Sequence, residues 1–234
     1  MKTAILNQLL ADRAAKRAVV LATDLASGEG QLLYPSDETS LAGVPSALAE
    51  AARAAAQDDR SVTVETGEGR VFLNVFNAPL RVIIVGAVHI AQPLARMAVL
   101  AGYEVVVVDP RRAFADQMRF PGVTVLSDWP DDAIAALAPD SRTAIVTLTH
   151  DPKIDDPALE VALGSGAFYV GALGSKKTHA ARLERLRAAG FDDKATARIQ
   201  GPIGLAIGAK SPAEIAVAIV AQMTEHLRKL REKP

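Results

Sequence analysis

From Arg81 onward, short apolar runs alternate with segments of helical periodicity. The apolar runs are rich in β-branched residues and lack a polar face, which is typical of strands covered by helices on both sides. Strands are therefore expected at 81–86, 103–109, 123–126, 143–148 and 168–174. Helices are expected at 90–101, near 112–118, and at 130–138, 157–164 and 176–190. This alternation predicts an α/β fold with a doubly wound parallel sheet of the Rossmann type.

The first part of the chain, up to about Phe76, has a mixed pattern. Apolar residues at helical spacing open it, two short β-rich runs follow, and an alanine-rich helix is expected at 46–57. The segment 61–76 alternates on both sides of a glycine-containing turn and predicts a hairpin. Because Pro79 then interrupts the pattern, we expect a small α+β domain at 1–77 and the Rossmann-like domain at 78–234.

Composition narrows the classes of partner. The chain has 26 Lys and Arg against 27 Asp and Glu, so no overall field attracts nucleic acid or an anionic membrane, and any anion site must be local. It has no cysteine, which excludes disulfides, thiolate metal sites and a cysteine nucleophile. The first residues, MKTAILNQLLADRAAKR, contain neither a secretory apolar region nor a membrane span. These features predict a soluble cytoplasmic protein.

The stretch RVIIVGAVHIAQPLA, 81–95, has the layout of a phosphate-binding turn. A strand that ends in glycine before a helix directs backbone N–H groups and the positive helix end at one point. Gly86 keeps the first glycine of the G-x-G-x-x-G fingerprint, whereas Val88 and Ala91 occupy the other two glycine positions. His89 lies in the middle of the turn.

Asp109 closes the second strand, 23 residues after Gly86. Rossmann folds place an acid for a ribose hydroxyl at this point, and Arg111 and Arg112 follow where they could meet a phosphate. An equally good interpretation is that Asp109 only caps the turn before Pro110.

Two of the four histidines fall in loops that the topology should bring together. His89 follows the first strand, and Thr149, His150 and Asp151 follow the fourth. In a doubly wound sheet these two loops flank the ligand crevice at the point where the strand order reverses. The alternative is that Asp151 or Asp155 fixes His150 in a structural contact.

A basic turn follows the fifth strand. Ser175 is expected to cap the helix 176–190, which puts Lys176 and Lys177 in the first turn, against the helix dipole. Such a placement makes sense if an anion binds there. A solvated surface pair of lysines is the alternative.

The last informative segment combines glycines with apolar residues. Gly201, Gly204 and Gly208 precede Ser211 and Glu214, which predict a capping box at the start of a helix. The glycine-rich part fits either a buried loop that covers a ligand or a packed structural crossover.

Taken in order, these motifs resemble the XdhC/CoxI family of accessory proteins for xanthine dehydrogenase and related molybdenum hydroxylases such as carbon monoxide dehydrogenase. The resemblance covers the chain from about Arg81 to Leu227. It rests on the segments GAVHIAQPLA, VVDPRRAFA, LTHDP, FYVGALGSKKTHAARLERLRAAGF and GPIGLAIGAKSPAEIAVAIVAQ.

The resemblance implies a maturation factor without catalytic residues and without a metal held by protein ligands. Its cofactor would be molybdenum cofactor, as molybdopterin or its cytosine dinucleotide, which the protein would protect during sulfuration and deliver to an apo-hydroxylase. A cysteine desulfurase as second partner and a homodimer stay open. The resemblance and the motifs together give the expected cofactor-binding residues Gly86, Val88, His89, Ile90, Asp109, Arg111, Arg112, Thr149, His150, Asp151, Gly174, Ser175, Lys176, Lys177, Gly201, Pro202 and Gly204.

The chain departs from the family in two respects. Full-length relatives usually have a longer amino-terminal domain with a glycine-rich, cysteine-containing segment, whereas this chain has no cysteine. Ala206 stands where many relatives have an acid, which removes a polar role at that position.

Two other classes of function remain alternatives. An NAD(P)-dependent oxidoreductase would need a proton donor, which His150 with Asp151 could supply, but the chain has Leu173 rather than lysine four residues after Tyr169. A nucleotide-sensing module would need no reactive group. The four histidines have no metal-ligand spacing.

Overall fold

The computed structural model describes residues 2–67 and 69–231, with the side chains of 230 and 231 excepted. The chain divides into two compact units, Met1–Ala78 and Pro79–Pro234. The division falls one residue after the joint expected between 77 and 78. Each unit has its own sheet and its own buried core.

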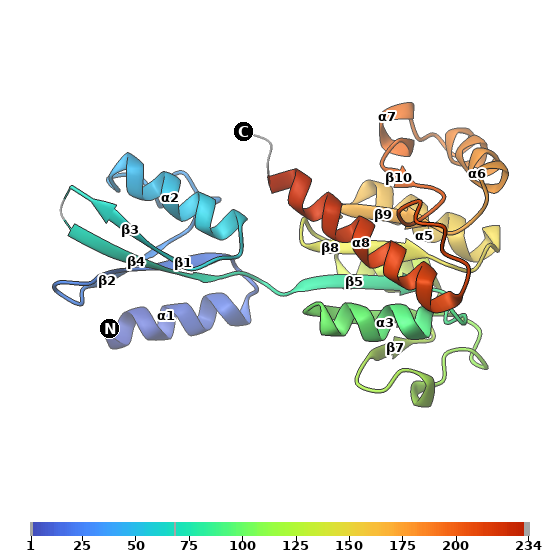
Figure 1. Cartoon of the computed structure of the whole chain (residues 1–234), viewed down its shortest axis with the longest axis horizontal. Coiled ribbons are helices and arrows are strands. Elements are labelled where there is room, and N and C mark those ends of the chain that lie inside the picture. Colours follow the sequence, from blue (N-terminus) through green and yellow to red (C-terminus); the bar gives the residue numbers. More distant parts are fainter. Residues whose placement is uncertain (1, 68, 232–234) are drawn as a thin grey trace. The chain divides into compact units, whose positions relative to one another are not determined.

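The first unit is an antiparallel sheet of the order β2-β1-β4-β3, with α2 on one face (Figure 1). Apolar residues of α2, among them Leu48 and Ala52, pack in a cluster with Val20 and Leu73 of the sheet. The expected α+β pattern is therefore present, including the hairpin of β3 and β4, although Glu68 of its turn lies outside the described residues. The elements are α1 (Thr3–Ala14), β1 (Val19–Asp24), β2 (Gly30–Leu33), α2 (Ser46–Gln57), β3 (Val62–Thr66) and β4 (Gly69–Phe76).

The second unit is a six-stranded parallel sheet of the order β10-β9-β8-β5-β6-β7. Counted from β5, this is the Rossmann order 3-2-1-4-5-6, with the reversal of strand order between β5 and β8. The predicted fold class is confirmed. The strands are β5 (Leu80–Val85), β6 (Tyr103–Val108), β7 (Thr124–Leu126), β8 (Thr143–Thr147), β9 (Tyr169–Ala172) and β10 (Ile199–Gln200).

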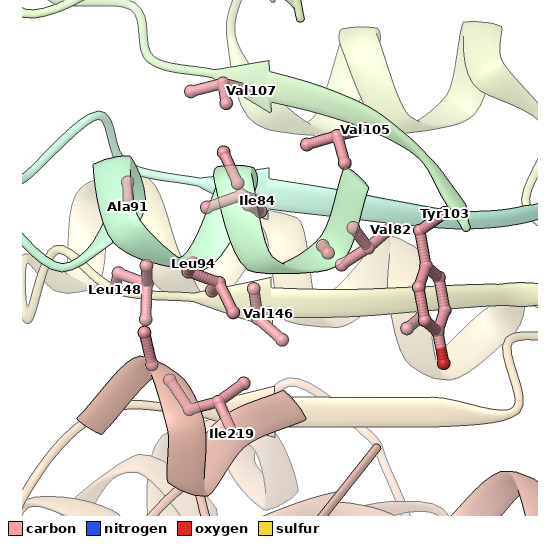
Figure 2. Close-up of a cluster of buried hydrophobic side chains, with 14 of the residues drawn as sticks. Val82, Ile84, Ala91, Leu94, Tyr103, Val105, Val107, Val146, Leu148 and Ile219 are labelled. Atoms are coloured by element: carbon pink, nitrogen blue, oxygen red, sulfur yellow. The ribbon is translucent and has the colours of Figure 1, made fainter. Parts of the chain in front are cut away.

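Helices cover both faces of this sheet because alternate residues along each strand point to opposite sides. Ile84 packs with Leu94 of α3 and Ile219 of α8 in one buried cluster (Figure 2). Its neighbour Ile83 packs with Leu159 of α5 in the other cluster. The helices are α3 (Ala91–Leu100), α4 (Pro130–Leu137), α5 (Pro152–Gly164), α6 (Lys176–Ala188), α7 (Asp193–Thr196) and α8 (Pro212–Arg231).

Two helix starts agree with the expected caps. Ser175 Oγ accepts the backbone N–H of Thr178 at 3.1 Å, and the first residue of α6 is Lys176. Ser211 and Glu214 form the reciprocal capping box of α8, in which Glu214 N–H donates to Ser211 Oγ and Ser211 N–H donates to Glu214 Oε2.

Three local expectations differ from the structure. No α-helix forms at 112–118, where the described chain makes turns and the short 3-10 helix Gln117–Arg119. Helix α5 begins at Pro152 rather than at 157, because Asp151 caps it through Lys153 N–H, and Pro157 lies inside it. The short elements α7 and β10 were not expected, since two to four residues give no readable periodicity.

Among the described residues, no helix is both long enough and apolar enough to span a bilayer.

Replacement of Ile84 by alanine tests the buried cluster of Figure 2. The side chain is fully buried, so we expect the free energy of unfolding to fall by about 2–5 kcal/mol. The measurement is urea denaturation followed by fluorescence of the chain's single tryptophan, Trp129, which lies in the second unit. Val99→Ala is the matched control, because Val99 is exposed on α3 and its loss should cost less than about 0.5 kcal/mol. Equal effects of the two substitutions would contradict this packing.

Candidate functional site

The predicted site residues lie at one edge of the second unit's sheet. Since all six strands are parallel, the segments that follow β5, β6, β8, β9 and β10 leave the sheet at the same edge. These segments contain every residue that the sequence nominated. Contacts between atoms of neighbouring turns show which of the turns lie against each other.

The turns after β5 and β8 are in direct contact. Gly86 has φ +101°, and a Cβ atom built on it would lie 2.5 Å from Cγ2 of Thr149. Leu148 N–H donates to the carbonyl of Val85, which continues the parallel ladder into the two turns. Glycine is therefore required at position 86 for both its backbone angle and its lack of a side chain.

The turn 86–90 presents backbone donors at the start of α3. In the part of the chain that the structure describes, the N–H groups of Val88, His89 and Ile90 have no hydrogen-bond acceptor. The side chains of Val88 and Ile90 pack on the core, whereas His89 is exposed. Free N–H groups at a helix N-terminus form an anion-binding arrangement.

Asp109 is fully buried at the end of β6, and protein groups occupy its carboxylate. Its Oδ2 accepts the backbone N–H of Ala87 at 2.8 Å and Nη2 of Arg111 at 2.7 Å. Its Oδ1 accepts Nε and the backbone N–H of Arg111. Burial alone would raise the pKa of Asp109, but these hydrogen bonds outweigh it and hold the pKa below its ordinary value.

This bonding favours the turn-capping interpretation of Asp109 over the ribose-binding one. The carboxylate fixes the phosphate turn through Ala87 and orients Arg111, whose guanidinium lies 4.3 Å from the centre of the Phe114 ring. Arg112 is exposed. At this strand end, Arg111 and Arg112 are therefore the groups that remain available to an anion.

The loop after β8 is organised by Asp155, which is 1% exposed. Its carboxylate accepts Oγ1 of Thr149 at 2.6 Å, Thr149 N–H at 3.3 Å and His150 N–H at 3.1 Å. His150 itself has φ +64° and an exposed side chain. Asp155 therefore fixes the backbone of His150 in a structural contact, whereas the imidazole side chain is exposed to solvent. Asp151 uses its carboxylate to cap α5.

Arg182 and Asp155 form a buried pair that the sequence interpretation missed. Arg182 Nη2 lies 3.6 Å from Oδ2 of Asp155 and donates to the carbonyl of Leu173 at 2.9 Å. Burial is the largest influence on both groups, and it raises the pKa of Asp155 and lowers that of Arg182. The pair joins the loops after β8 and β9. In the sequence, Arg182 lies one helical turn before the apolar Leu186, and this spacing alone is too weak a signal to reveal the pair.

The basic turn follows β9. Gly174 has φ +148°, and a Cβ atom there would lie 3.1 Å from Cβ of Thr178, so the turn packs closely on α6. Lys176 and Lys177 are exposed, and neither has an ion-pair partner among the described residues. Two cations thus lie beside the N-terminal N–H groups of α6.

The closing loop after β10 is packed on the protein itself. Gly201, which precedes a cis peptide bond to Pro202, lies against the ring of His179, where a Cβ atom would overlap. Gly204 N–H donates to Oε1 of Gln222, and a Cβ atom at Gly204 would contact Ala218 at 3.0 Å. These contacts favour a structural crossover for 201–204.

The second half of the closing loop is different. Ala206, Ile207 and Gly208 are exposed. The alternative of a loop that covers a ligand therefore stays a prediction for 206–208.

The arrangement of the described residues can hold an anion. Backbone donors at 88–90 and the cations Arg111, Lys176 and Lys177 are available at the edge, while Asp109 and Asp155 are buried and occupied. Within residues 2–67 and 69–231, no three His, Cys, Asp or Glu side chains gather in a group that could hold a metal ion.

Known proteins resemble the chain in both sequence and fold. A family model described as the XdhC Rossmann domain matches residues 82–223. YqeB of Escherichia coli K12, described as uncharacterized, is 29% identical over 159 residues, which are 68% of this chain and 29% of that protein. PaoD of the same organism, a molybdenum cofactor insertion chaperone, is 30% identical over 148 residues, which are 63% of this chain and 40% of PaoD.

Two further matches come from Bacillus species. A Bacillus subtilis 168 protein, described as a probable xanthine dehydrogenase subunit, is 29% identical over 156 residues, 66% of this chain and 45% of that protein. A crystal structure of a Bacillus halodurans protein, described as a xanthine dehydrogenase, has a TM-score of 0.70 at 23% identity and covers 98% of this chain and 66% of that one. The structural match shows a shared fold. The matched segment spans less than half of each curated relative.

The contact between Gly86 and Thr149 predicts a coupled pair of substitutions. Gly86→Ala should lower the free energy of unfolding by about 1–3 kcal/mol, through backbone strain and overlap with the Thr149 methyl group. Thr149→Ser removes that methyl and keeps the hydroxyl that donates to Asp155, so the double variant should recover part of the loss. A double-mutant cycle from Trp129 fluorescence measures the coupling, and strictly additive effects would contradict the contact.

Asp109→Asn should destabilise the second unit in a pH-dependent way. Because the folded-state pKa of Asp109 is lowered, its ionised form contributes stability above the unfolded-state pKa of about 3.9 and loses that contribution as pH falls through the folded-state value. The variant should therefore lose about 1–3 kcal/mol relative to the parent protein near pH 7, and less near pH 3. Urea denaturation at several pH values tests this, with the exposed Glu160→Gln as control. A loss that is the same at every pH would argue against the ionised hydrogen bonds.

Proposed function

The chain belongs to the XdhC family, as its motifs predicted, and from that premise we propose that it is an accessory protein for molybdenum hydroxylases. In this proposal it binds molybdenum cofactor at the sheet edge and supports insertion of the cofactor into the apo-enzyme. The observation that carries the proposal is the group of unpaired donors and cations on the turns after β5 and β9. The relative named as a molybdenum cofactor insertion chaperone supports the same assignment.

The available donors suit the chemistry of this ligand. A pterin cofactor carries a phosphate, and its dinucleotide form carries a diphosphate, so it presents anionic groups at one or two points. Backbone N–H groups at a helix N-terminus bind such oxygens through hydrogen bonds and the helix dipole. Lysine ammonium groups bind them as positive point charges. Both kinds of donor are present, at 88–90 and at Lys176 and Lys177.

We assign a role to each group at the sheet edge according to whether it is exposed or buried. The N–H groups of Val88, His89 and Ile90 would bind one phosphate group, and Lys176 and Lys177 would bind a second or a more distant one. Arg111, held in place by Asp109, would face the same ligand. Asp109 and Asp155 would position these groups without touching it, because both carboxylates are buried and occupied.

The cofactor supplies the molybdenum centre, and the chain's own residues bind, orient and shield it. Because the chain has no cysteine, it cannot carry sulfur as a persulfide. If sulfuration occurs on the bound cofactor, the reactive thiol comes from outside this chain, for example from a cysteine desulfurase.

An NAD(P)-dependent oxidoreductase is the second candidate, favoured by the Rossmann strand order and by the two arginines after β6. Two observations weigh against it. The carboxylate that would bind a ribose is occupied by Ala87 and Arg111, and Val88 replaces the glycine that lets a diphosphate approach the backbone. The same binding experiment separates the two functions.

The proposal predicts that calorimetric titration shows tighter binding of molybdenum cofactor than of NAD(P). It also predicts that an apo molybdenum hydroxylase gains molybdenum and activity only when this chain is present. Tighter binding of NAD(P), or equal hydroxylase activation without the chain, would refute the assignment.

Replacement of both Lys176 and Lys177 by alanine should weaken cofactor binding at least about tenfold, since each charge-assisted contact contributes on the order of 1.5–3 kcal/mol. Thermal stability should change little, because both side chains are exposed. The matched control replaces Lys194 and Lys229, two exposed lysines of α7 and α8, and should bind normally. An early melting transition with normal binding would instead assign the two lysines a structural role.

A further inference from the structure

A groove runs along the outer side of α3, outside the residues so far assigned to the cofactor. It has a volume of about 280 Å³ and lies between the helix and the chain that leads into β7. Ala95, Val99 and Leu100 contribute from α3, and Phe120 and Val123 from the other wall. The groove is thus apolar over most of its length.

Apolar side chains around the groove remain in contact with solvent. Leu100 is 88% exposed and Val99 is 47% exposed. Met118, next to the groove residue Arg119 in the chain, is 89% exposed. Single exposed apolar residues are ordinary, but a hollowed cluster of them marks an interaction surface.

The charge at the groove is positive and uncompensated. Arg96 and Arg119 line it, and neither has a carboxylate partner among the described residues. In the amide orientation that satisfies both of its polar atoms, Gln92 accepts Nε and Nη2 of Arg119 at 3.0 and 2.8 Å, which fixes one guanidinium at the groove. A complementary partner must therefore bring apolar side chains together with a carboxylate.

The groove begins beside the proposed cofactor site. Gln92 is the second residue of α3 and lies two residues after Ile90, the last of the three residues with unpaired N–H groups. From Gln92 to Leu100 the groove follows the helix for about 12 Å. A protein that occupied the groove would lie next to a phosphate group bound at 88–90, so the cofactor would not need to diffuse through water between the two proteins.

We propose that this groove docks an apolar, carboxylate-bearing segment of the hydroxylase that receives the cofactor. The inference rests on the proposed function, because transfer explains why the groove adjoins the anion site. The competing occupant is a second copy of this chain, since Trp129 is 55% exposed beside Asp128, Asp131 and Asp132. The experiment distinguishes the two.

The test uses the full chain and the molybdenum hydroxylase of its source organism, produced without cofactor. The groove variant combines Val99→Gln, Leu100→Gln and Arg96→Glu, three changes at exposed positions. The matched control combines Val217→Gln and Arg228→Glu on α8, where both residues are also exposed. Three quantities are measured for each protein: cofactor affinity by calorimetry, affinity for the apo-hydroxylase by biolayer interferometry, and molar mass by light scattering.

We expect the groove variant to bind molybdenum cofactor within about twofold of the parent protein and to bind the apo-hydroxylase at least tenfold more weakly, with a matching loss of hydroxylase activation. The control should behave like the parent in all three measurements. Unchanged hydroxylase affinity of the groove variant would overturn the inference. So would a groove variant that dissociates a dimer of this chain while activating the hydroxylase normally. If the parent protein fails to bind the cofactor, the proposed function fails, whatever the groove does.

Discussion

The candidate site depends on the parallel alignment of β5 and β8, the neighbours at which the strand order reverses. Their hydrogen-bonded ladder brings Gly86 against Thr149. The other turns at this edge of the sheet are joined to the two turns that contain these residues. Asp109 ties the first turn to the end of β6 through Ala87, and Asp155 ties Thr149 to Arg182 and hence to the loop after β9. Four loops from distant parts of the sequence are thereby fixed by two buried carboxylates.

Much of this architecture could be predicted from the sequence because it is encoded locally. Apolar runs without a polar face indicated the parallel strands, and Ser175 and Ser211 marked their helices by short-range caps. The Asp155–Arg182 pair could not be found this way, since the partners are 27 residues apart and each looks like an ordinary helix residue until the tertiary fold buries it. The start of α5 was misplaced because Pro157 mimics a first helical residue.

The two buried acids also change the interpretation of the motif residues. A Rossmann acid at the end of the second strand suggests ribose recognition, yet Asp109 stabilises the phosphate turn and orients Arg111. The chain thus keeps the framework of a dinucleotide fold and uses Asp109 internally, which leaves backbone donors and cations available at the edge, together with the exposed carboxylate of Asp151. Backbone N–H groups at a helix start suit phosphorylated ligands in general, so this edge is compatible with the proposed cofactor.

The contact between Gly201 and His179 restricts which residues position 201 can hold. The imidazole of His179 occupies the space where any residue larger than glycine at position 201 would place its Cβ atom. A residue larger than glycine can therefore stand at position 201 only where the side chain at 179 is smaller or displaced, whereas position 179 can become smaller while glycine is kept. In this crossover, the histidine ring thus restricts the glycine position more than the glycine restricts the ring.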